Sequence, residues 1–291
     1  MKLILSRKGF DSGMKSGGCP SPVFPNGVML SLPIPDKDSN IRYSSLEYGE
    51  MNLGQLLVDL TGQEKRRNNF AHLDPDLNSG ALAREPGWRP LLGQASAAQG
   101  HLDNQKVGIG DLFLFFGLYQ RVKKTDGKWR FDKLSRREHV LWGWLQVGAE
   151  YKVRRLREGE LDWAEYHPHL QSKHRRNNTL YAAADNLRIK GKQFDFPAAG
   201  IFSNYDERLV LTAPKPNRKC TQWRLPPSFF PSPGKPPLSY HCNLERWQRS
   251  ESGGYCLLSS VSRGQEFVLD LEHYPDVTDW LESLLPLATS P

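Results

Sequence analysis

Cysteine is scarce in this chain of 291 residues, and its distribution excludes two kinds of protein. Cys19, Cys220, Cys242 and Cys256 form no Cys-x-x-Cys pair, so the zinc-finger and redox motifs that need that spacing are absent. Four scattered cysteines are also too few for the disulfide framework of a small secreted domain. We therefore expect a protein of a reducing compartment, the cytoplasm.

Long apolar runs and common cofactor motifs are missing as well. No run of about 18 apolar residues occurs, so we expect no membrane-spanning helix. The opening MKLILSRKGF places a charged pair too early for a secretory signal. Neither a P-loop nor the Gly-x-Gly-x-x-Gly fingerprint is present, which disfavours nucleotide cofactors held in those ways. We expect no cofactor, no bound metal and no obligate protein partner.

Positive charge is in moderate excess and is clustered. Lys and Arg total 39 against 32 acids, and a net charge of +7 is weak support for a nucleic-acid partner by itself. Clusters at 65–67, 152–157 and 173–176 strengthen it, because cations release counterions from phosphates and neighbouring amides add hydrogen bonds. A solvated surface is the alternative interpretation. We assign phosphate contacts to Arg7, Lys8, Lys173, His174, Arg175, Arg176 and Asn178.

Strand patterns outnumber helix patterns along the chain, which favours an α+β fold. We expect a mixed, strand-rich sheet or partial barrel with flanking helices, and a long surface loop over 214–237, which holds eight prolines. Residues 1–291 form a single domain in this interpretation, with 238–291 as a possible C-terminal lobe. We expect strands at 2–8, 108–117, 139–153, 199–212 and 254–271, a hairpin over 23–35 with Asn26-Gly27 at its turn, and helices at 51–60, 92–104 and 277–287, the last capped by Asp276 or Thr278.

Three acidic residues are candidates for catalysis. In an extended segment, the pattern His72-x-Asp74-x-Asp76 would place three side chains on one face. Such a group could hold a divalent metal or divide acid and base roles between two carboxylates, whereas caps around a turn at Pro75 are the alternative. Asp11 borders a glycine-rich loop that resembles an anion nest or, alternatively, a polar turn. We rank Asp74 first, Asp76 second and Asp11 third, with His72 as their partner.

Amides and aromatic residues suggest a pocket for a base. Gln94 and Gln99 lie among small residues and can read a base edge, although close helix packing also explains the small residues. We expect Trp142 and Trp144 on one face of the strand at 139–153, where they can stack on a base or pack in the core. A zinc site at His-Pro-His is disfavoured. We assign Gln94, Gln99, His101, Trp142, Trp144, His167, His169 and Tyr181 to the base pocket.

Several motifs in combination resemble one family. They are SRKGFDS…GGCPSP, SLPIP, HLDPDL, LGQASAAQGHL, GDLFLFFG, WGWLQVG and HPHL…NTLYAA. Together they resemble the nucleotide modification-associated domain family of the third type, over a region from Met1 to about Trp280. The resemblance implies a role in systems that make or act on hypermodified DNA bases, often in phage conflict. It does not fix the reaction or the catalytic residues.

Three classes of function remain open, all with double-stranded DNA carrying modified bases as the partner. A DNA glycosylase that excises a hypermodified base in anti-phage defence needs a basic channel, a pocket for a flipped nucleotide and a carboxylate, and it needs no cofactor. A base-modifying transferase would need a donor site, and no such motif is recognisable. A non-catalytic reader would use the strands at 108–117 and 139–153, but it leaves the Asp, His and Gln residues outside them unexplained. We favour the glycosylase.

Overall fold

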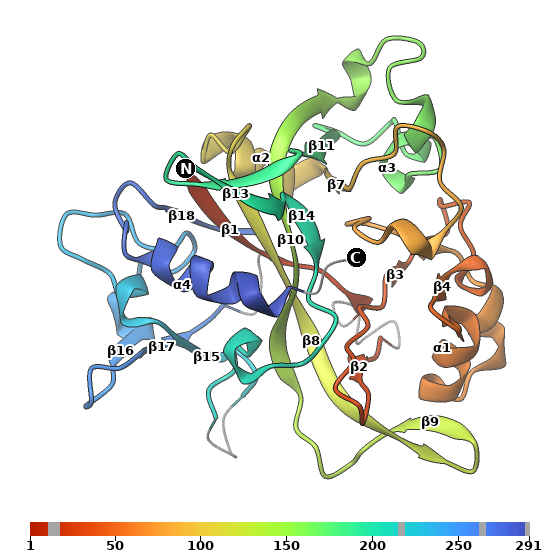
Figure 1. The fold of residues 1–291 in the computed structure, drawn as a ribbon, viewed down its shortest axis with the longest axis horizontal. Coiled ribbons are helices and arrows are strands. Elements are labelled where there is room, and N and C mark those ends of the chain that lie inside the picture. Colours follow the sequence, from red (N-terminus) through yellow and green to blue (C-terminus); the bar gives the residue numbers. More distant parts are fainter. Residues whose placement is uncertain (11–17, 215–218, 262–265, 289–291) are drawn as a thin grey trace.

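Two long strands cross the centre of the computed structural model, which describes residues 1–10, 18–214, 219–261 and 266–288 (Figure 1). They are β8 (Leu112–Thr125) and β10 (Glu138–Lys152), an antiparallel pair. The first nine residues of β8 are buried, as its continuous apolar run predicts for a strand covered on both faces. Strand β9 (Lys128–Phe131) folds back on β8 through a tight turn at Asp126-Gly127, where both residues have positive φ.

The sheet around this pair is mixed and open. Strand β1 (Lys2–Arg7) runs parallel to β8. The sheet continues through antiparallel pairs that involve β10, β11 (Thr179–Ala183), β7 (Leu91–Gln94) and β18 (Glu266–Asp270). Within the described residues the sheet does not close into a barrel, so the expected strand-rich α+β fold is confirmed. Its order is β18 (Glu266–Asp270), β1 (Lys2–Arg7), β8, β10, β11 (Thr179–Ala183) and β7 (Leu91–Gln94), with β2 (Ser21–Val23), β9 and β14 (Ala199–Ile201) paired beside β8 or β10.

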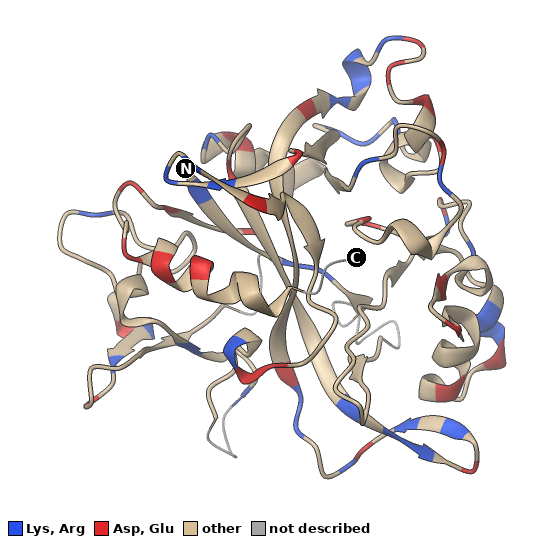
Figure 2. Ribbon diagram, in the orientation of Figure 1, with Lys and Arg blue, Asp and Glu red and all other residues tan. Residues whose placement is uncertain are grey.

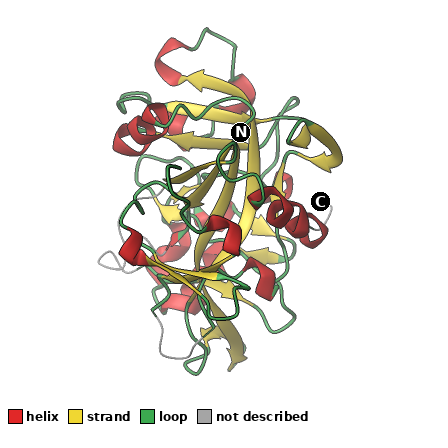
Figure 3. Ribbon diagram, turned by 90° about the vertical axis from the view of Figure 1, so that its left-hand side faces the viewer, coloured by secondary structure: helices red, strands yellow, loops and turns green. Residues whose placement is uncertain are grey.

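Short elements surround the sheet, and the helices lie at its periphery (Figure 3). The helices are α1 (Leu53–Thr61), α2 (Ser96–Asn104), α3 (Pro168–Gln171) and α4 (Val277–Leu284). The small sheets are β3 (Ile34–Pro35) with β6 (Ala71–His72), β4 (Glu47–Tyr48) with β5 (Met51–Asn52), β12 (Asn186–Ile189) with β13 (Lys192–Pro197), and β15 (Gln222–Leu225) with β17 (Cys256–Ser259) and β16 (Trp247–Arg249).

Local sequence explains the confirmed helices. Helix α1 begins after Asn52, whose side chain accepts a hydrogen bond from the Gln55 N–H, and it ends at Gly62 in the left-handed conformation. It buries Leu56 and Leu57 on the side that its apolar spacing predicts. Helix α4 also forms where expected, although Asp276 makes no side-chain capping bond.

Several expected elements differ from the structure. The strand expected over 254–271 forms β17 and β18 in different sheets, and the hairpin expected over 23–35 keeps its turn while β3 pairs with β6. The 92–104 segment divides into β7 and α2 because Gln94 pairs with Thr179 in the sheet, and this long-range pairing overrides the local helical pattern. The proline-rich loop contains β15, whose residues 222–225 carry no proline and are free to pair with β17. Of the strand expected over 199–212, only β14 forms, and a short 3-10 turn at Glu207–Leu209 follows it.

Two buried histidines away from the predicted site residues make stability depend on pH. Burial, with a smaller contribution from Arg7, lowers the pKa of His139 to about 3, and the Trp223 indole donates to its Nδ1 at 3.0 Å. Burial likewise lowers the pKa of His241 to about 4. Both imidazoles are therefore neutral in the folded protein near neutral pH, whereas an unfolded chain protonates them below about pH 6.5.

We expect acid to weaken the fold through these two groups. Their contribution is complete above about pH 6.5 and is lost as the pH falls towards 4, by at most about 1.4 kcal/mol per pH unit for each histidine. Urea unfolding at pH 7, 6 and 5 measures this slope. His139→Asn keeps an acceptor for Trp223 and should have a shallower slope than the parent protein, so an equal slope would rule out His139 as a contributor.

Candidate functional site

A polar cavity of about 390 Å³ brings together segments that are far apart in the sequence. Its volume lies in the range of sites for small molecules and is sufficient for a nucleoside-sized group. The end of β1, the end of β6, the turn after β7 and helix α3 all contribute side chains. The polar residues of its lining include Lys8, His72, Asp74, Gln94, His169 and Arg175.

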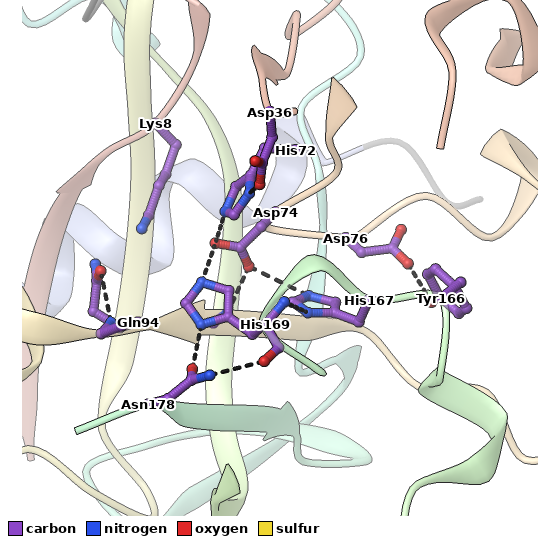
Figure 4. Close-up of polar contacts among 12 residues, drawn as sticks. Lys8, Asp36, His72, Asp74, Asp76, Gln94, Tyr166, His167, His169 and Asn178 are labelled. Atoms are coloured by element: carbon purple, nitrogen blue, oxygen red, sulfur yellow. Dashed lines mark hydrogen bonds and ion pairs between the residues drawn. The ribbon is translucent and has the colours of Figure 1, made fainter. Parts of the chain in front are cut away.

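Asp74 lies at the centre of the polar cluster (Figure 4). Its side chain is 3% exposed, and its Oδ1 accepts a hydrogen bond from the Gly93 N–H at 2.5 Å. Burial by itself would raise the pKa of this carboxyl, but the imidazole of His167 and the nearby charge of Lys8 outweigh it and hold the pKa well below its usual range. Asp74 is therefore a buried, ionised carboxylate.

His72 reaches Asp74 from β6, which pairs with β3. Its Nε2 lies 3.8 Å from Asp74 Oδ2, and its Nδ1 is 2.6 Å from Asp36 Oδ2. The hydrogen bond from His72 is the main reason that the pKa of Asp36 falls to about 2. A carboxylate at that pKa only accepts hydrogen bonds, so His72 donates through Nδ1, and in the neutral tautomer of the ring Nε2 carries a lone pair.

His169 approaches the same carboxylate oxygen from α3. Its Nε2 lies 3.8 Å from Asp74 Oδ2, and burial lowers its pKa to about 3, so the ring is neutral. Asn178 donates its amide N–H groups to the carbonyls of His169 and Ser172, at 2.7 and 3.1 Å. The Asn178 Oδ1 therefore faces His169 Nδ1, at 2.5 Å, and accepts its proton. His169, like His72, directs a lone pair of Nε2 towards Asp74.

His167 holds the other oxygen of the carboxylate. Its Nδ1 accepts a bond from the His169 N–H at the start of α3, which leaves the proton on Nε2. That Nε2 lies 3.5 Å from Asp74 Oδ1, and the imidazole is completely buried. Asp74 Oδ1 thus accepts the Gly93 N–H bond and lies on the side of His167, whereas Oδ2 faces the Nε2 atoms of His72 and His169.

Gly93 permits the close packing between β7 and the site. A Cβ at this position would overlap the His169 ring, and the backbone N–H of Gly93 also holds Asp74. We expect Gly93→Ala to cost about 1–3 kcal/mol of unfolding free energy and to displace His169. Gly100→Ala, in the interior of α2 with open space around its Cβ, should instead stabilise by about 0.5–1 kcal/mol. Thermal unfolding of both variants tests this contrast, and equal effects would contradict it.

Asp76 does not join His72 and Asp74, so the expectation of three side chains on one face is wrong. Strand β6 ends at His72, and the alternation of an extended strand does not continue through Pro75. Asp76 instead accepts two hydrogen bonds of 2.7 Å from Arg84 and one of 2.5 Å from Tyr166. Asp76 therefore forms a structural ion pair with Arg84.

Four residues assigned to the base pocket lie away from the cavity, each in a contact that explains it. Gln99 donates to the Tyr181 hydroxyl at 2.8 Å, and both side chains are buried in the core. His101 packs on Tyr240, with ring centroids 4.4 Å apart. Trp144 packs on aromatic side chains and donates to a backbone carbonyl at 3.1 Å.

Trp142 lines a second, smaller cavity of about 80 Å³ beside the polar one, and Lys8, Gly9 and Asp74 border both. The register of β10 against β8 shifts between Leu141 and Gly143, and the two tryptophans line different cavities. The expectation of one aromatic face is therefore wrong.

Gln94 lines the polar cavity, and its amide donates to the buried Glu266, which lies 3.5 Å from Lys8 Nζ.

The cations assigned to phosphate binding divide into two groups. Arg7, Lys8 and Arg175 line the polar cavity, and Arg175 also lies 3.6 Å from Asp36. Lys173, His174 and Arg176 are exposed in the turn after α3. Lys and Arg as a whole are spread over several elements rather than gathered on one face (Figure 2).

Asn178 is buried, and its amide bonds within the protein, so its assignment to phosphate is wrong and it positions His169 instead. Asp11 lies outside the described residues. Sequence reasoning missed Asp36 and the positioning role of His167. The partner of His72 is 36 residues away, directly after β3, and no local pattern indicates that pairing. The cap of α3 by His167 is more local, because a polar residue directly before Pro168 is a helix-start signal.

The fold and the site together define a class of protein: an open α+β sheet that holds a buried carboxylate and imidazoles at the edge of a cationic cavity. The chain belongs to the nucleotide modification associated domain 3 family, whose model matches residues 2–270. This confirms the resemblance and links the chain to nucleotide modification. No curated protein and no solved structure gave a match. Among the described residues, no helix combines the length and apolar character needed to cross a membrane.

Proposed function

We propose that this protein is a DNA glycosylase that releases a modified base from double-stranded DNA at the polar cavity. The observation that carries the proposal is the ionised, buried carboxylate of Asp74 at a cavity of nucleoside size bordered by Lys8 and Arg175. Membership of a nucleotide-modification family supports a nucleotide as the ligand. A base inside a duplex must leave the stack to reach such a cavity, and base-acting enzymes offset the cost of this flipping through interactions of this kind.

Asp74 has the charge that the reaction requires. When the bond between C1′ and the base nitrogen breaks, positive charge develops on the sugar, and a fixed carboxylate lowers the barrier. Water then adds its hydroxyl group to C1′, and its proton passes to the departing base nitrogen. The imidazoles of His72 and His169 lie beside Asp74, and either ring can take up that proton from the water and pass it on to the departing base nitrogen.

In this proposal the exposed cations after α3 hold the DNA backbone near the cavity. We expect Lys173→Gln with Arg176→Gln to weaken DNA binding and to reduce the slope of log affinity against log salt by up to about 1.8, or about 0.9 for each phosphate that is no longer neutralised. Fluorescence anisotropy across a salt series measures the slope. Lys128→Gln with Lys133→Gln, an exposed pair in another part of the chain, is the matched control. Equal slopes for the two double variants would make the 173–176 turn an ordinary solvated surface.

A second candidate is an enzyme that alters the base and leaves it attached to the sugar. One observation favours it: two imidazole lone pairs face Asp74, whereas a glycosylase that uses a carboxylate alone does not need them. A non-catalytic reader has less support, because Trp144 is committed to the core.

Product analysis separates these functions. Purified protein is incubated with phage DNA that carries hypermodified bases and with plain DNA of matched sequence. The glycosylase yields free base and an equal number of abasic sites from the modified DNA. An altered nucleoside after complete digestion would indicate base modification. Retention of modified DNA without any chemical change would indicate a reader and would contradict both enzymatic proposals.

A further inference from the structure

We infer that His72, Asp74 and His169 bind one divalent transition-metal ion at the wall of the polar cavity. Each of the three residues offers one ligand atom within 4.8 Å of the other two, and the Nε2 atoms of His72 and His169 both lie 3.8 Å from Asp74 Oδ2. Two imidazoles and one carboxylate are a recurrent ligand set for iron and zinc, and they leave positions open for water or substrate. This set comes from three separate segments, the end of β6, the turn that follows it and helix α3.

The tautomers of both histidines are already fixed for a metal. Asp36 accepts the Nδ1 proton of His72, and Asn178 accepts the Nδ1 proton of His169. Metal-binding histidines almost always donate the other ring N–H in this way to a carboxylate or an amide or backbone oxygen, which orients the ring and makes the free nitrogen a better ligand. Both free nitrogens face the same oxygen of Asp74.

Hydrogen bonding among these three groups does not explain their arrangement. The two Nε2–Oδ2 separations are 3.8 Å, beyond the range of about 2.7–3.2 Å for N–H···O bonds. Two lone pairs directed at a buried carboxylate repel it, and a cation between them converts that repulsion into attraction. Ligands at about 2.1 Å around a tetrahedral metal are roughly 3.4 Å apart, so small side-chain rotations suffice.

The other oxygen of Asp74 and the surrounding charges complete the argument. The Gly93 N–H donates to Oδ1 and His167 Nε2 lies on the same side at 3.5 Å, so Oδ2 is the oxygen left for the metal. The carboxylates of Asp74 and Asp36 offset the charge of an incoming cation, while Lys8 and Arg175 border the cavity on which the open positions of the metal would lie. Nitrogen ligands favour zinc, iron or cobalt over magnesium and calcium, which prefer oxygen.

The catalytic consequence of the inference rests on the proposed function, whereas metal binding is measured without DNA. A metal ion at this place would lower the pKa of a bound water and supply the hydroxide that adds to C1′. It would equally serve the second candidate function, in which the base is altered.

The test begins with protein stripped by a chelator. It is titrated separately with Co²⁺, Zn²⁺ and anaerobic Fe²⁺, and bound metal is counted by elemental analysis after gel filtration. We expect about one equivalent of at least one ion, an absorption band of low-symmetry Co²⁺, and no competition from excess Mg²⁺. His72→Gln and His169→Gln should each lose the band, whereas His101→Gln, outside the cavity, should keep it. Asp36→Asn should weaken binding by about 10–100-fold through the loss of the outer partner of His72.

Unfolding of each metal-free variant separates loss of the ligand from loss of the fold. Binding below one tenth of an equivalent in folded parent protein would overturn the inference. Equal loss in His101→Gln and His72→Gln would also overturn it, because the metal would then be held non-specifically. Full base release by metal-free protein in the presence of chelator would contradict the catalytic use of the metal and leave the proposed function intact. One bound metal without any action on modified DNA would support the metal site and contradict the proposed function.

Discussion

Asp74→Asn is expected to reduce the rate of base release by about 10²–10⁴-fold, the range over which single charged groups contribute to catalysis. The asparagine has nearly the same shape, so its oxygen can still accept the Gly93 N–H bond. What the substitution removes is the negative charge that faces the developing positive charge on the sugar. DNA affinity should remain within about twofold, because the carboxylate lies inside the cavity with only 3% of its side chain exposed.

Single-turnover measurements with saturating protein test this expectation, since they report the chemical step and not product release. Asp185→Asn is the matched control because it makes the same change of charge at a carboxylate that is 88% exposed. We expect its rate to equal that of the parent protein. A normal rate for Asp74→Asn, with folding verified, would remove Asp74 from catalysis, and the charge that assists base release would have to come from another residue.

Local patterns in the sequence are sufficient for the centre of the fold. The apolar run at 112–120 produces a strand buried on both faces, and the spacing of Leu56 and Leu57 produces the buried side of α1. These features depend on residues close together in the chain. The place of each strand within the sheet depends on distant pairings, and for that reason the local pattern predicts a helix at Gln94 although this residue pairs with Thr179.

The candidate site likewise combines residues of one local motif with partners from distant parts of the chain. His72 and Asp74 are recognisable because they are neighbours in one motif, and the structure brings His72 Nε2 within 3.8 Å of Asp74 Oδ2. Asp36, directly after β3, and Gly93, on β7, act on them from other parts of the chain, and nothing near His72 or Asp74 in the sequence indicates these partners. From the sequence, only backbone preference places Asp74 before Asp76 as the catalytic candidate. The structure shows that Asp76 forms an ion pair with Arg84.

Breaking the ion pair of Asp76 and Arg84 should cause the largest loss of unfolding free energy that we expect. Asp76 is 1% exposed and Arg84 is 10% exposed, with Arg84 Nη2 2.7 Å from Asp76 Oδ1. Removing one member of a buried pair leaves the other charge without compensation, which typically costs about 3–5 kcal/mol. We expect this loss from Asp76→Asn and from Arg84→Gln, and a double variant that loses much less than the sum of the two, as measured by urea unfolding.

The exposed pair of Arg89 and Asp185 has the same N–O distance, 2.7 Å, with side chains 41% and 88% exposed. Water screens this pair, so Asp185→Asn should cost less than about 1 kcal/mol. Distance alone would predict equal losses for the two pairs, whereas desolvation predicts a difference of several-fold. If Asp76→Asn proved as mild as Asp185→Asn, the pair with Arg84 would not be structural, and Asp76 would return beside Asp74 as a candidate for the catalytic carboxylate.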